Sequence, residues 1–194
     1  YFHKSHGGTS DFHLPCQAGS NRVLTLMNRR YTREWYLNRV NRLRAAIPNI
    51  AITTDIIAGF PGEREQDFQQ TLSLLEEVRY DGIFAFNYSD RPNTKASTLP
   101  DHVSEEVKND RLQQVLALQK HINFEKNSDM VGKTFEVLPE TVNPRFPDTL
   151  TGRTRTNHVV TFPGNRDLLG KFVLVEITEA HSFRLSGRAV DSKQ

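Results

Sequence analysis

The sequence of 194 residues predicts an α/β fold in two parts. Up to about residue 130, β-branched runs alternate with amphipathic helical patterns, which is the order of βαβ units with a parallel sheet. Beyond that point, short alternating segments are separated by Gly and Pro, which is typical of a small antiparallel β-barrel. We therefore expect an α/β region over residues 13–130 and a barrel over residues 131–191. Residues 1–12 show no periodicity and are predicted to be an irregular start.

The helices of the first part are predicted from their ends and their apolar spacing. A short helix is expected within residues 21–31. A longer one over 32–47 has Thr32 as its N-cap and stops at Pro48. Further helices are predicted over 64–79 and from Ser104, the N-cap, to about residue 128. The expected inward faces are Leu37, Val40, Leu43 and Ile47, then Phe68, Leu72, Leu75 and Val78, and finally Leu112, Val115, Leu118 and Ile122.

Two strands of the first part are predicted over residues 50–57 and 83–88. The first is rich in β-branched residues with little charge, which indicates a parallel strand buried on both faces. The barrel strands are expected over residues 133–138, 151–156, 158–162, 171–177 and 183–190.

Composition limits the class of protein. Apolar residues make up 37% of the chain, and the net charge is +2. No apolar run approaches the roughly 18 residues needed to cross a membrane, and no signal peptide is visible. The single cysteine, Cys16, excludes an internal disulfide and fits a reducing compartment, so a cytoplasmic protein is expected. Cys16 itself is interpreted as a small buried side chain. Because residue 1 is Tyr, we expect a processed, trimmed or fragmentary chain.

Positive charge is concentrated near the start of the chain. The stretch from Arg22 to Arg44 contains seven arginines and only one acidic residue, Glu34. Arginine binds phosphate in a bidentate manner, so this block either contacts a phosphate or forms the solvated face of a surface helix.

Two strand-end turns are candidate ligand sites, because small molecules bind at the carboxyl ends of parallel strands. Residues 55–63 read Asp-Ile-Ile-Ala-Gly-Phe-Pro-Gly-Glu, and the glycines let a backbone approach a ligand. Alone, this is equally an ordinary turn into a helix. Residues 13–20 read His-Leu-Pro-Cys-Gln-Ala-Gly-Ser, where Gln17 and Ser20 offer polar groups. Ser20 can instead merely cap the next helix.

Together these two strings resemble the fourth and fifth strands of radical S-adenosylmethionine enzymes, and more narrowly the tRNA methylthiotransferases. The resemblance implies that S-adenosylmethionine is held by Gln17 and Ser20 near its ribose and by Ile57 and Gly59 at its adenine. The sequence Met-Asn-Arg-Arg-Tyr at 27–31 also follows the family. It implies that Arg29 or Arg30 reaches the methionine carboxylate or an RNA phosphate.

A third string, Tyr-Ser-Asp-Arg-Pro-Asn-Thr at 88–94, resembles the family's sixth-strand segment, with Asn93 where Gly is usual. Its Arg-Pro-x-Thr form points to the tRNA-modifying branch. Within the motif, Arg91 is expected at substrate or cofactor; outside it, Arg91 would be an ordinary surface arginine.

The barrel resembles the TRAM domain, an RNA-binding, OB-like fold. The matching strings are residues 150–157 and 185–188. Arg153, Arg155 and Arg188 are the expected phosphate contacts. Phe162 and Phe183 could stack on bases, but both are predicted to belong to the barrel core instead.

The family's radical chemistry needs 4Fe–4S clusters held by cysteines in a Cys-x3-Cys-x2-Cys loop. One cysteine cannot supply them, and the histidines show no ligand spacing, so neither a metal site nor a catalytic residue is predicted here. The resemblance therefore implies the last part of a radical S-adenosylmethionine barrel plus a TRAM domain, inactive alone.

The whole enzyme would add a methylthio group to C2 of N6-isopentenyladenosine beside the anticodon. Its partners would be the tRNA anticodon stem-loop and the missing N-terminal half, and the complete enzyme would be a monomer. Two alternatives remain. One is a non-catalytic RNA-binding module, and the other is the sister methylthiotransferase acting on threonylcarbamoyladenosine.

Overall fold

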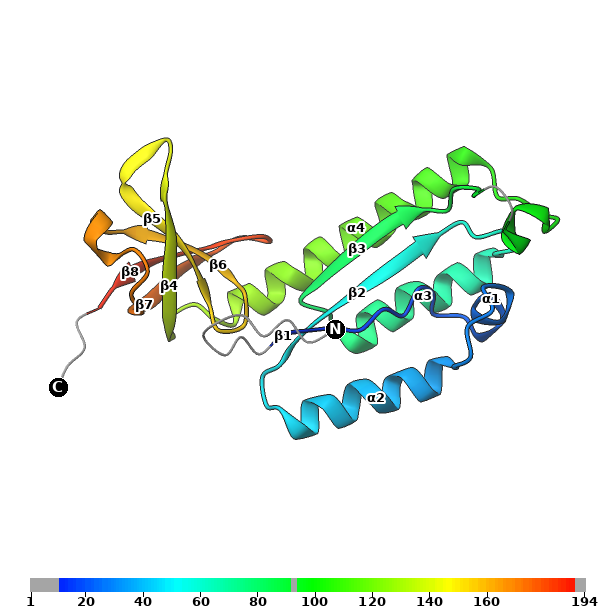
Figure 1. Ribbon diagram of the computed structural model, residues 1–194, viewed down its shortest axis with the longest axis horizontal. Coiled ribbons are helices and arrows are strands. Elements are labelled where there is room, and N and C mark those ends of the chain that lie inside the picture. Colours follow the sequence, from blue (N-terminus) through cyan, green and yellow to red (C-terminus); the bar gives the residue numbers. More distant parts are fainter. Residues whose placement is uncertain (1–10, 92–93, 191–194) are drawn as a thin grey trace. The chain divides into compact units, whose positions relative to one another are not determined.

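A computed structural model describes residues 11–91 and 94–190 (Figure 1). They divide into two compact units, residues 12–119 and 120–190, which we describe separately. The irregular start predicted for residues 1–10 and the turn at Asn93 lie outside the described residues. Residues 11 and 12, also predicted to be irregular, belong to a short strand.

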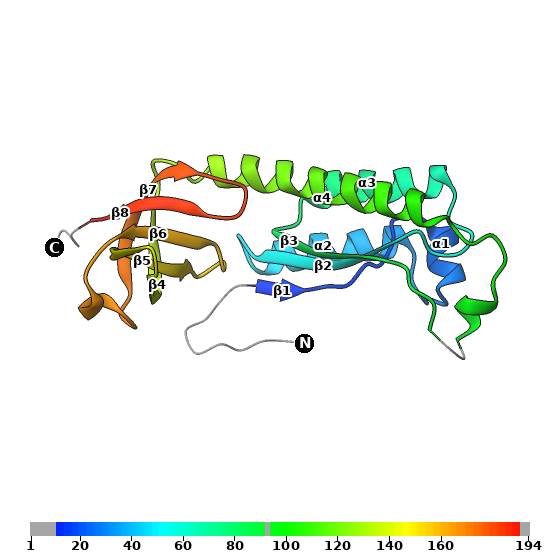
Figure 2. The same cartoon turned by 90° about the horizontal axis from the view of Figure 1, so that it is seen from above.

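The first unit is built on a three-stranded sheet with the order β1-β2-β3. Strands β2 and β3 are parallel, with Asp55 opposite Phe84 and Ile57 opposite Phe86. In Figure 2 the helices α2, α3 and α4 lie on one side of this sheet. The strands are β1 (Asp11–His13), β2 (Ala51–Ala58) and β3 (Gly82–Asn87), and the helices are α1 (Asn21–Leu26), α2 (Arg33–Ala46), α3 (Glu65–Val78), the 3-10 helix η1 (Lys95–Thr98) and the start of α4 (Glu105–Ser128).

Strand β2 is not buried on both faces as predicted. Burial alternates along it: Ile52 and Ile56 are fully buried against the helices, whereas Asp55 and Ile57 are half-buried. The reason is that no described element of this unit covers the second face of the sheet. A strand covered on one side shows period-two burial, whatever its composition.

The predicted helices are confirmed, with their caps. The Thr32 hydroxyl accepts from the Trp35 amide at 3.3 Å, and the Ser104 hydroxyl accepts from the Val107 amide at 3.4 Å. Their buried faces differ in part from the prediction. In α2 the buried side chains are Tyr36 and Val40, because the Tyr36 hydroxyl reaches inward to donate to the Leu14 carbonyl at 2.7 Å. Leu37, Leu43, Ile47, Leu72, Leu112 and Leu118 are only half-buried.

The second unit is a closed barrel with the strand order β4-β5-β6-β8-β7, in which β7 also pairs with β4. The barrel confirms the prediction, except that it is not wholly antiparallel. Strands β6 and β8 pair in parallel, with Val160 opposite Leu185. The elements are β4 (Thr134–Asn143), β5 (Phe146–Thr154), β6 (Val159–Pro163), the 3-10 helix η2 (Arg166–Leu168), β7 (Val173–Ala180) and β8 (Leu185–Ala189).

The barrel core contains Phe162, which is 1% exposed, together with Val137, Leu150, Val160 and Val175. The core prediction for Phe162 is therefore confirmed. It is wrong for Phe183, which is 70% exposed. Phe183 lies in the turn between β7 and β8. Because it is not part of a strand, the alternation of inward and outward side chains does not apply to it.

Candidate functional site

The carboxyl ends of the strands bring two of the predicted cofactor residues together. After β1 the chain continues beside β2, and the Gln17 amide donates to the Asp55 carbonyl at 2.9 Å. In return, the Gln17 carbonyl accepts from the Ile57 amide at 2.9 Å. Gln17 has a positive φ of 68°, an uncommon conformation for a non-glycine residue that the paired backbone holds in place. Gln17 and Ile57 are thus fixed relative to each other at the end of the sheet.

Gly59 lies two residues beyond Ile57, in the turn that leads to α3. Its φ is +72°, and a Cβ at this position would lie 2.3 Å from Cγ of Lys108. Its amide donates to the Glu63 carboxylate at 2.7 Å. Position 59 thus requires a glycine because the Lys108 side chain of α4 packs directly against its backbone. The Gly59 amide already has an acceptor in Glu63. Both observations give Gly59 a structural role beside any ligand role.

The Ser20 hydroxyl already has partners other than Gln17, Ile57 and Gly59. Its hydroxyl donates to the Asp67 carboxylate at 2.6 Å and accepts from the Val23 amide at 3.5 Å, which caps α1. The side chain is 1% exposed. Burial opposes ionisation of Asp67, but bonds from Arg22 and Ser20 outweigh it and hold the Asp67 pKa below its usual value. Capping is thus the role of Ser20 that the geometry supports.

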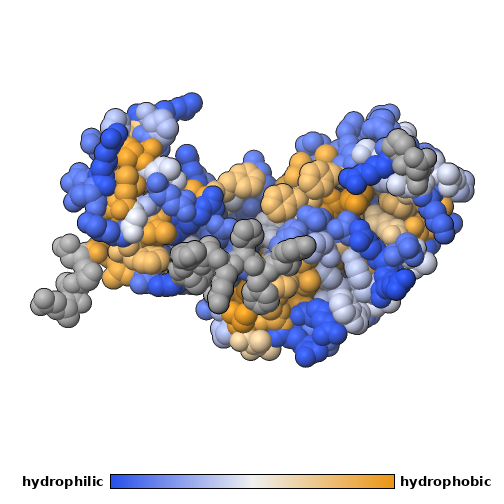
Figure 3. Space-filling view, in the orientation of Figure 1, coloured by the Kyte–Doolittle hydropathy of each residue, from blue (hydrophilic) through white to orange (hydrophobic). Residues whose placement is uncertain are grey.

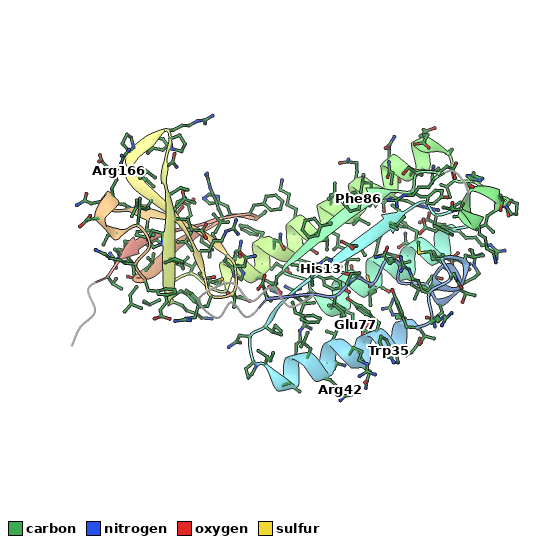
Figure 4. The ribbon with its side chains drawn as sticks, in the orientation of Figure 1. His13, Trp35, Arg42, Glu77, Phe86 and Arg166 are labelled. Atoms are coloured by element: carbon green, nitrogen blue, oxygen red, sulfur yellow. The ribbon has the colours of Figure 1, made fainter. Side chains whose placement is uncertain are left out.

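The uncovered face of the sheet carries a cluster that the sequence alone did not indicate. The His13 ring bonds the Thr53 hydroxyl at 2.9 Å, lies 3.4 Å from the Asp55 carboxylate and meets Phe84 edge-on. Phe84 and Phe86 are each 57% exposed. Figure 4 marks His13 and Phe86, and Figure 3 shows hydrophobic side chains at the surface over β2 and β3. This open face offers aromatic surface next to a polar His–Asp pair.

Behind Gly59, a buried ion pair links the turn after β2 to α4. The Arg111 guanidinium donates to the Glu63 carboxylate at 2.8 Å, and both side chains are at most 6% exposed. Burial raises the pKa of Glu63 above its usual value, although Gly59 and Arg111 act against that shift. Lys108, also buried, pairs with Glu105 at 2.8 Å and lies over the Tyr88 ring. Through these contacts, Arg111 and Lys108 of α4 hold the strand-end turn in place.

The arginines of the predicted Arg22–Arg44 block divide between structure and solvent. Arg22 bonds the Asp67 carboxylate, and Arg33 reaches Glu77 at 2.8 Å. Arg29, Arg30 and Arg42 are exposed. Arg91, in the loop after β3, is exposed as well. Arg29 and Arg30 lie in the turn between α1 and α2 and thus remain accessible to phosphate.

The three barrel arginines are exposed but paired. Arg153 lies 3.4 Å from the Glu140 carboxylate, and Arg188 donates to Glu176 through two nitrogens at 2.8 and 2.9 Å. Arg155 pairs with Glu136 and lies over the Phe172 ring. Each arginine would have to leave or share its carboxylate to bind a phosphate.

Cys16 is 1% exposed, which confirms the buried assignment. Burial raises the pKa of its thiol to about 11, so the thiol is protonated at neutral pH. Across residues 11–91 and 94–190, no group of three or more His, Cys, Asp or Glu side chains could hold a metal ion. Within the same residues, no helix is long and apolar enough to span a membrane.

Sequence reasoning missed two features that a closer count would have indicated. Phe84 and Phe86 repeat with a period of two, which is the pattern of a strand with one distinct face. Lys108 occurs seven residues before Val115, and Arg111 seven residues before Leu118, so both fall on the apolar face of the helix. Charged residues on such a face indicate buried partners.

Comparison with known proteins finds one family model that matches within each part of the chain. Residues 4–75 match the radical SAM superfamily model, and residues 128–190 match the TRAM domain model. The chain is 49% identical over 179 residues to the tRNA-2-methylthio-N(6)-dimethylallyladenosine synthase of Thermoanaerobacter sp. (strain X514), covering 92% of this chain and 38% of the relative. The enzymes of the same name from Carboxydothermus hydrogenoformans and Bacteroides thetaiotaomicron are each 51% identical, over 90% and 92% of this chain and 40% and 39% of their own lengths.

The chain thus spans about two fifths of the length of the curated relatives it matches. The two matched ranges include the strand-end turn at Gly59 and all five strands of the barrel. The chain is thus similar, over this share of their length, to tRNA-2-methylthio-N(6)-dimethylallyladenosine synthases, and it combines a match to the radical SAM superfamily model with a match to the TRAM domain model.

Proposed function

We propose that this chain is the C-terminal part of an enzyme that adds a methylthio group to C2 of N6-isopentenyladenosine beside the tRNA anticodon. The observation that carries the proposal is the identity of about 50%, over some nine tenths of the chain, to synthases named for this product. The whole enzyme would be a cytoplasmic monomer that binds the anticodon stem-loop. In this proposal, the first unit supplies half of the reaction chamber and the barrel binds RNA.

S-adenosylmethionine fits the end of the sheet in part. Ile57 presents a half-buried apolar side chain on the open face, where an adenine ring could pack. Gln17 is held beside it, and Gly59 lets the turn fold back closely. Ser20 is the poorest of the four predicted contacts, since Asp67 and the α1 cap occupy its hydroxyl. When bound at an iron–sulfur cluster, S-adenosylmethionine supplies the radical chemistry of this superfamily.

An iron–sulfur cluster does not fit this chain. Its one thiol, at Cys16, is buried, protonated and close to the Asp55 carbonyl at 3.7 Å. We therefore assign the cluster to a part of the enzyme outside this segment and derive no step through it. Open-face residues such as His13 and Asp55 would instead contact the substrate or the cofactor by hydrogen bonds.

A chimera tests the proposal directly. The matching segment of the Bacteroides thetaiotaomicron synthase is replaced by this chain, and the chimera is expressed in bacteria that lack their own synthase. We expect mass spectrometry of digested tRNA to show the 2-methylthio nucleoside. A chimera with Gln17→Ala and Ile57→Asp should make far less of it. A stable chimera that leaves isopentenyladenosine unmodified would refute the proposal.

The single cysteine favours one second candidate, a non-catalytic RNA-binding module. The DNA directly upstream of the Tyr1 codon separates the two. An open frame that encodes Cys-x3-Cys-x2-Cys supports the enzyme. A stop codon followed by a ribosome-binding site supports the module, as would tight, salt-dependent tRNA binding by a stable 194-residue monomer.

A further inference from the structure

One hollow lies wholly within the second unit, where the end of α4 meets the turn between β7 and β8. Its volume is about 550 Å³, and it is lined by Lys120, Phe124, His181, Ser182, Phe183 and Arg184. Two of these residues are exposed aromatics: Phe124 is 48% and Phe183 70% exposed. None of the lining residues is acidic. The hollow therefore combines aromatic surface with positive charge.

The walls of the hollow are held by hydrogen bonds. Asn127, on α4, donates from its side-chain amide to the His181 carbonyl at 2.6 Å and so fixes the turn against the helix. The turn itself is closed by the His181 amide, which donates to the Arg184 carbonyl at 2.9 Å. Lys120 and Phe124 are four residues apart and share one face of α4. The backbone of the turn is thus already in place against the helix before a ligand enters, which lowers the entropy lost on binding.

The charges of the hollow differ from those of the predicted phosphate contacts. Arg153, Arg155 and Arg188 are each paired with a glutamate. In contrast, neither the Lys120 ammonium nor the Arg184 guanidinium forms an ion pair with any residue among 11–91 and 94–190. A phosphate can therefore bind to these two cations without displacing a carboxylate, so the hollow has the more available positive charge.

From this juxtaposition we infer that the hollow binds single-stranded RNA, with an unstacked base on Phe183 or Phe124 and the flanking phosphates on Lys120 and Arg184. Every nucleotide presents a flat ring beside a negative charge, and sequence-tolerant RNA sites combine the same two elements. A paired duplex hides its base faces and cannot use the aromatic part. The inference deepens the proposed function and rests on it only in identifying the RNA as tRNA.

Binding of labelled RNA to the 194-residue chain, followed by fluorescence anisotropy, tests the site. The probes are an RNA hairpin with an unpaired loop and a fully paired duplex of the same length. We expect the hairpin to bind more tightly. Phe183→Ala should weaken hairpin binding by about fivefold or more, the lower end of the loss of one base stack. Phe183→Trp should restore it, because tryptophan also stacks.

Lys120→Ala with Arg184→Ala should reduce the slope of log affinity against log salt by about 1.4.

Matched controls separate the hollow from the general charge and apolar surface of the barrel. Phe146→Ala removes an aromatic ring that is 64% exposed on β5, and Arg166→Ala removes an exposed arginine from η2. Neither residue lines the hollow, so both variants should bind the hairpin nearly as well as the parent chain. Crosslinking with 4-thiouridine in the loop should label Phe124 or Phe183.

Three results would overturn the inference: equal losses in hollow and control variants, equal binding of hairpin and duplex, or no RNA binding by the parent chain. The chimera experiment remains a separate test of the proposed function. If the chimera modifies tRNA but the hollow variants still bind the hairpin normally, only the inference about the hollow is refuted. If the chimera is inactive but the hollow variants lose hairpin binding, only the proposed enzymatic function is refuted.

Discussion

Gly59 has a clear structural role at the position where we propose that a ligand approaches the backbone. Its positive φ of 72° excludes most side chains, and Lys108 occupies the space where a Cβ would lie. Gly132 has a similar φ of 79° but no atom within 4 Å of a Cβ. The two glycines therefore share the conformational constraint and differ only in the close approach.

We predict that Gly59→Ala lowers the free energy of unfolding by about 2–4 kcal/mol, whereas Gly132→Ala costs only about 1 kcal/mol. The difference is the contact with Lys108, which must move if a methyl group is added. Urea denaturation of the two variants and the parent chain measures both values. Equal losses would show that the conformation alone decides the cost and that Lys108 yields easily.

Cys16 provides a second prediction at this scale. Its buried thiol has a pKa of about 11, above the ordinary value, because burial disfavours the thiolate. The unfolded state loses the thiol proton at lower pH than the native state. Stability is therefore complete below pH 8 and falls as the pH rises towards 11, by up to about 2–3 kcal/mol.

Cys16→Ala removes this dependence and is the matched comparison. Urea midpoints for both proteins, measured from pH 7.5 to 10, should converge as the pH rises, because only the parent carries the thiol. A thiol reagent at pH 8 should label the parent slowly until urea unfolds it. Fast labelling of the native protein would contradict the buried, protonated thiol.

At the scale of elements, local patterns were sufficient wherever the cause was local. Thr32 and Ser104 cap their helices as their sequences predict, since a hydroxyl before an amphipathic run has nearby amides to bond. Burial was predicted less well, because it depends on neighbours far along the chain. Nothing local to β2 shows that one face is uncovered. Likewise, the parallel pairing of β6 with β8 depends on how the barrel closes.

The candidate site follows the same division. The strand-end turns of Gln17 and Gly59 were visible as motifs, and Gln17 and Ile57 do lie together. The partners of the predicted arginines were not visible, because Glu140, Glu136 and Glu176 come from other strands of the barrel. The hollow around Phe183 joins residues about 60 positions apart in sequence, so no local pattern could have indicated it.

The Glu63–Arg111 pair connects two elements, the turn after β2 and helix α4, and its removal is predicted to be costly. Arg111→Met leaves the Glu63 carboxylate buried without its partner, which we expect to lower the free energy of unfolding by about 3–5 kcal/mol. Without Arg111, Glu63 ionises less readily in the native state. Above the ordinary pKa of a glutamate, the unfolded state therefore binds fewer protons than the native state. The loss should accordingly be larger at pH 8 than at pH 5.

Glu65→Gln is the control for this pair. Glu65 also contacts Arg111, at 3.3 Å, but its side chain is 64% exposed, so its removal should change stability little at either pH. Denaturation of both variants at the two pH values decides the matter. An Arg111→Met loss that is the same at pH 5 and pH 8 would mean that Glu63 does not carry the unpaired charge.

At the scale of the whole molecule, the open face of the sheet is the feature with the largest consequence. Phe84 and Phe86 together expose two aromatic rings beside the half-buried Ile57, on a face that no described element of the first unit covers. Burial of one such side chain is worth about 1.5–3 kcal/mol. The chain can gain that energy when two copies meet at this face, so we expect concentration-dependent self-association.

Phe84→Ser with Phe86→Ser should weaken this self-association by at least about tenfold, which corresponds to about 1.4 kcal/mol. Phe146→Ser, which removes a ring of similar exposure from the barrel, should leave it unchanged. Sedimentation velocity over a concentration series measures all three proteins. In the chimera, by contrast, the same face would form part of the reaction chamber. The double serine variant should therefore lose tRNA modification there while folding normally. Association that Phe146→Ser weakens as strongly as the double variant would instead assign the contact to the barrel.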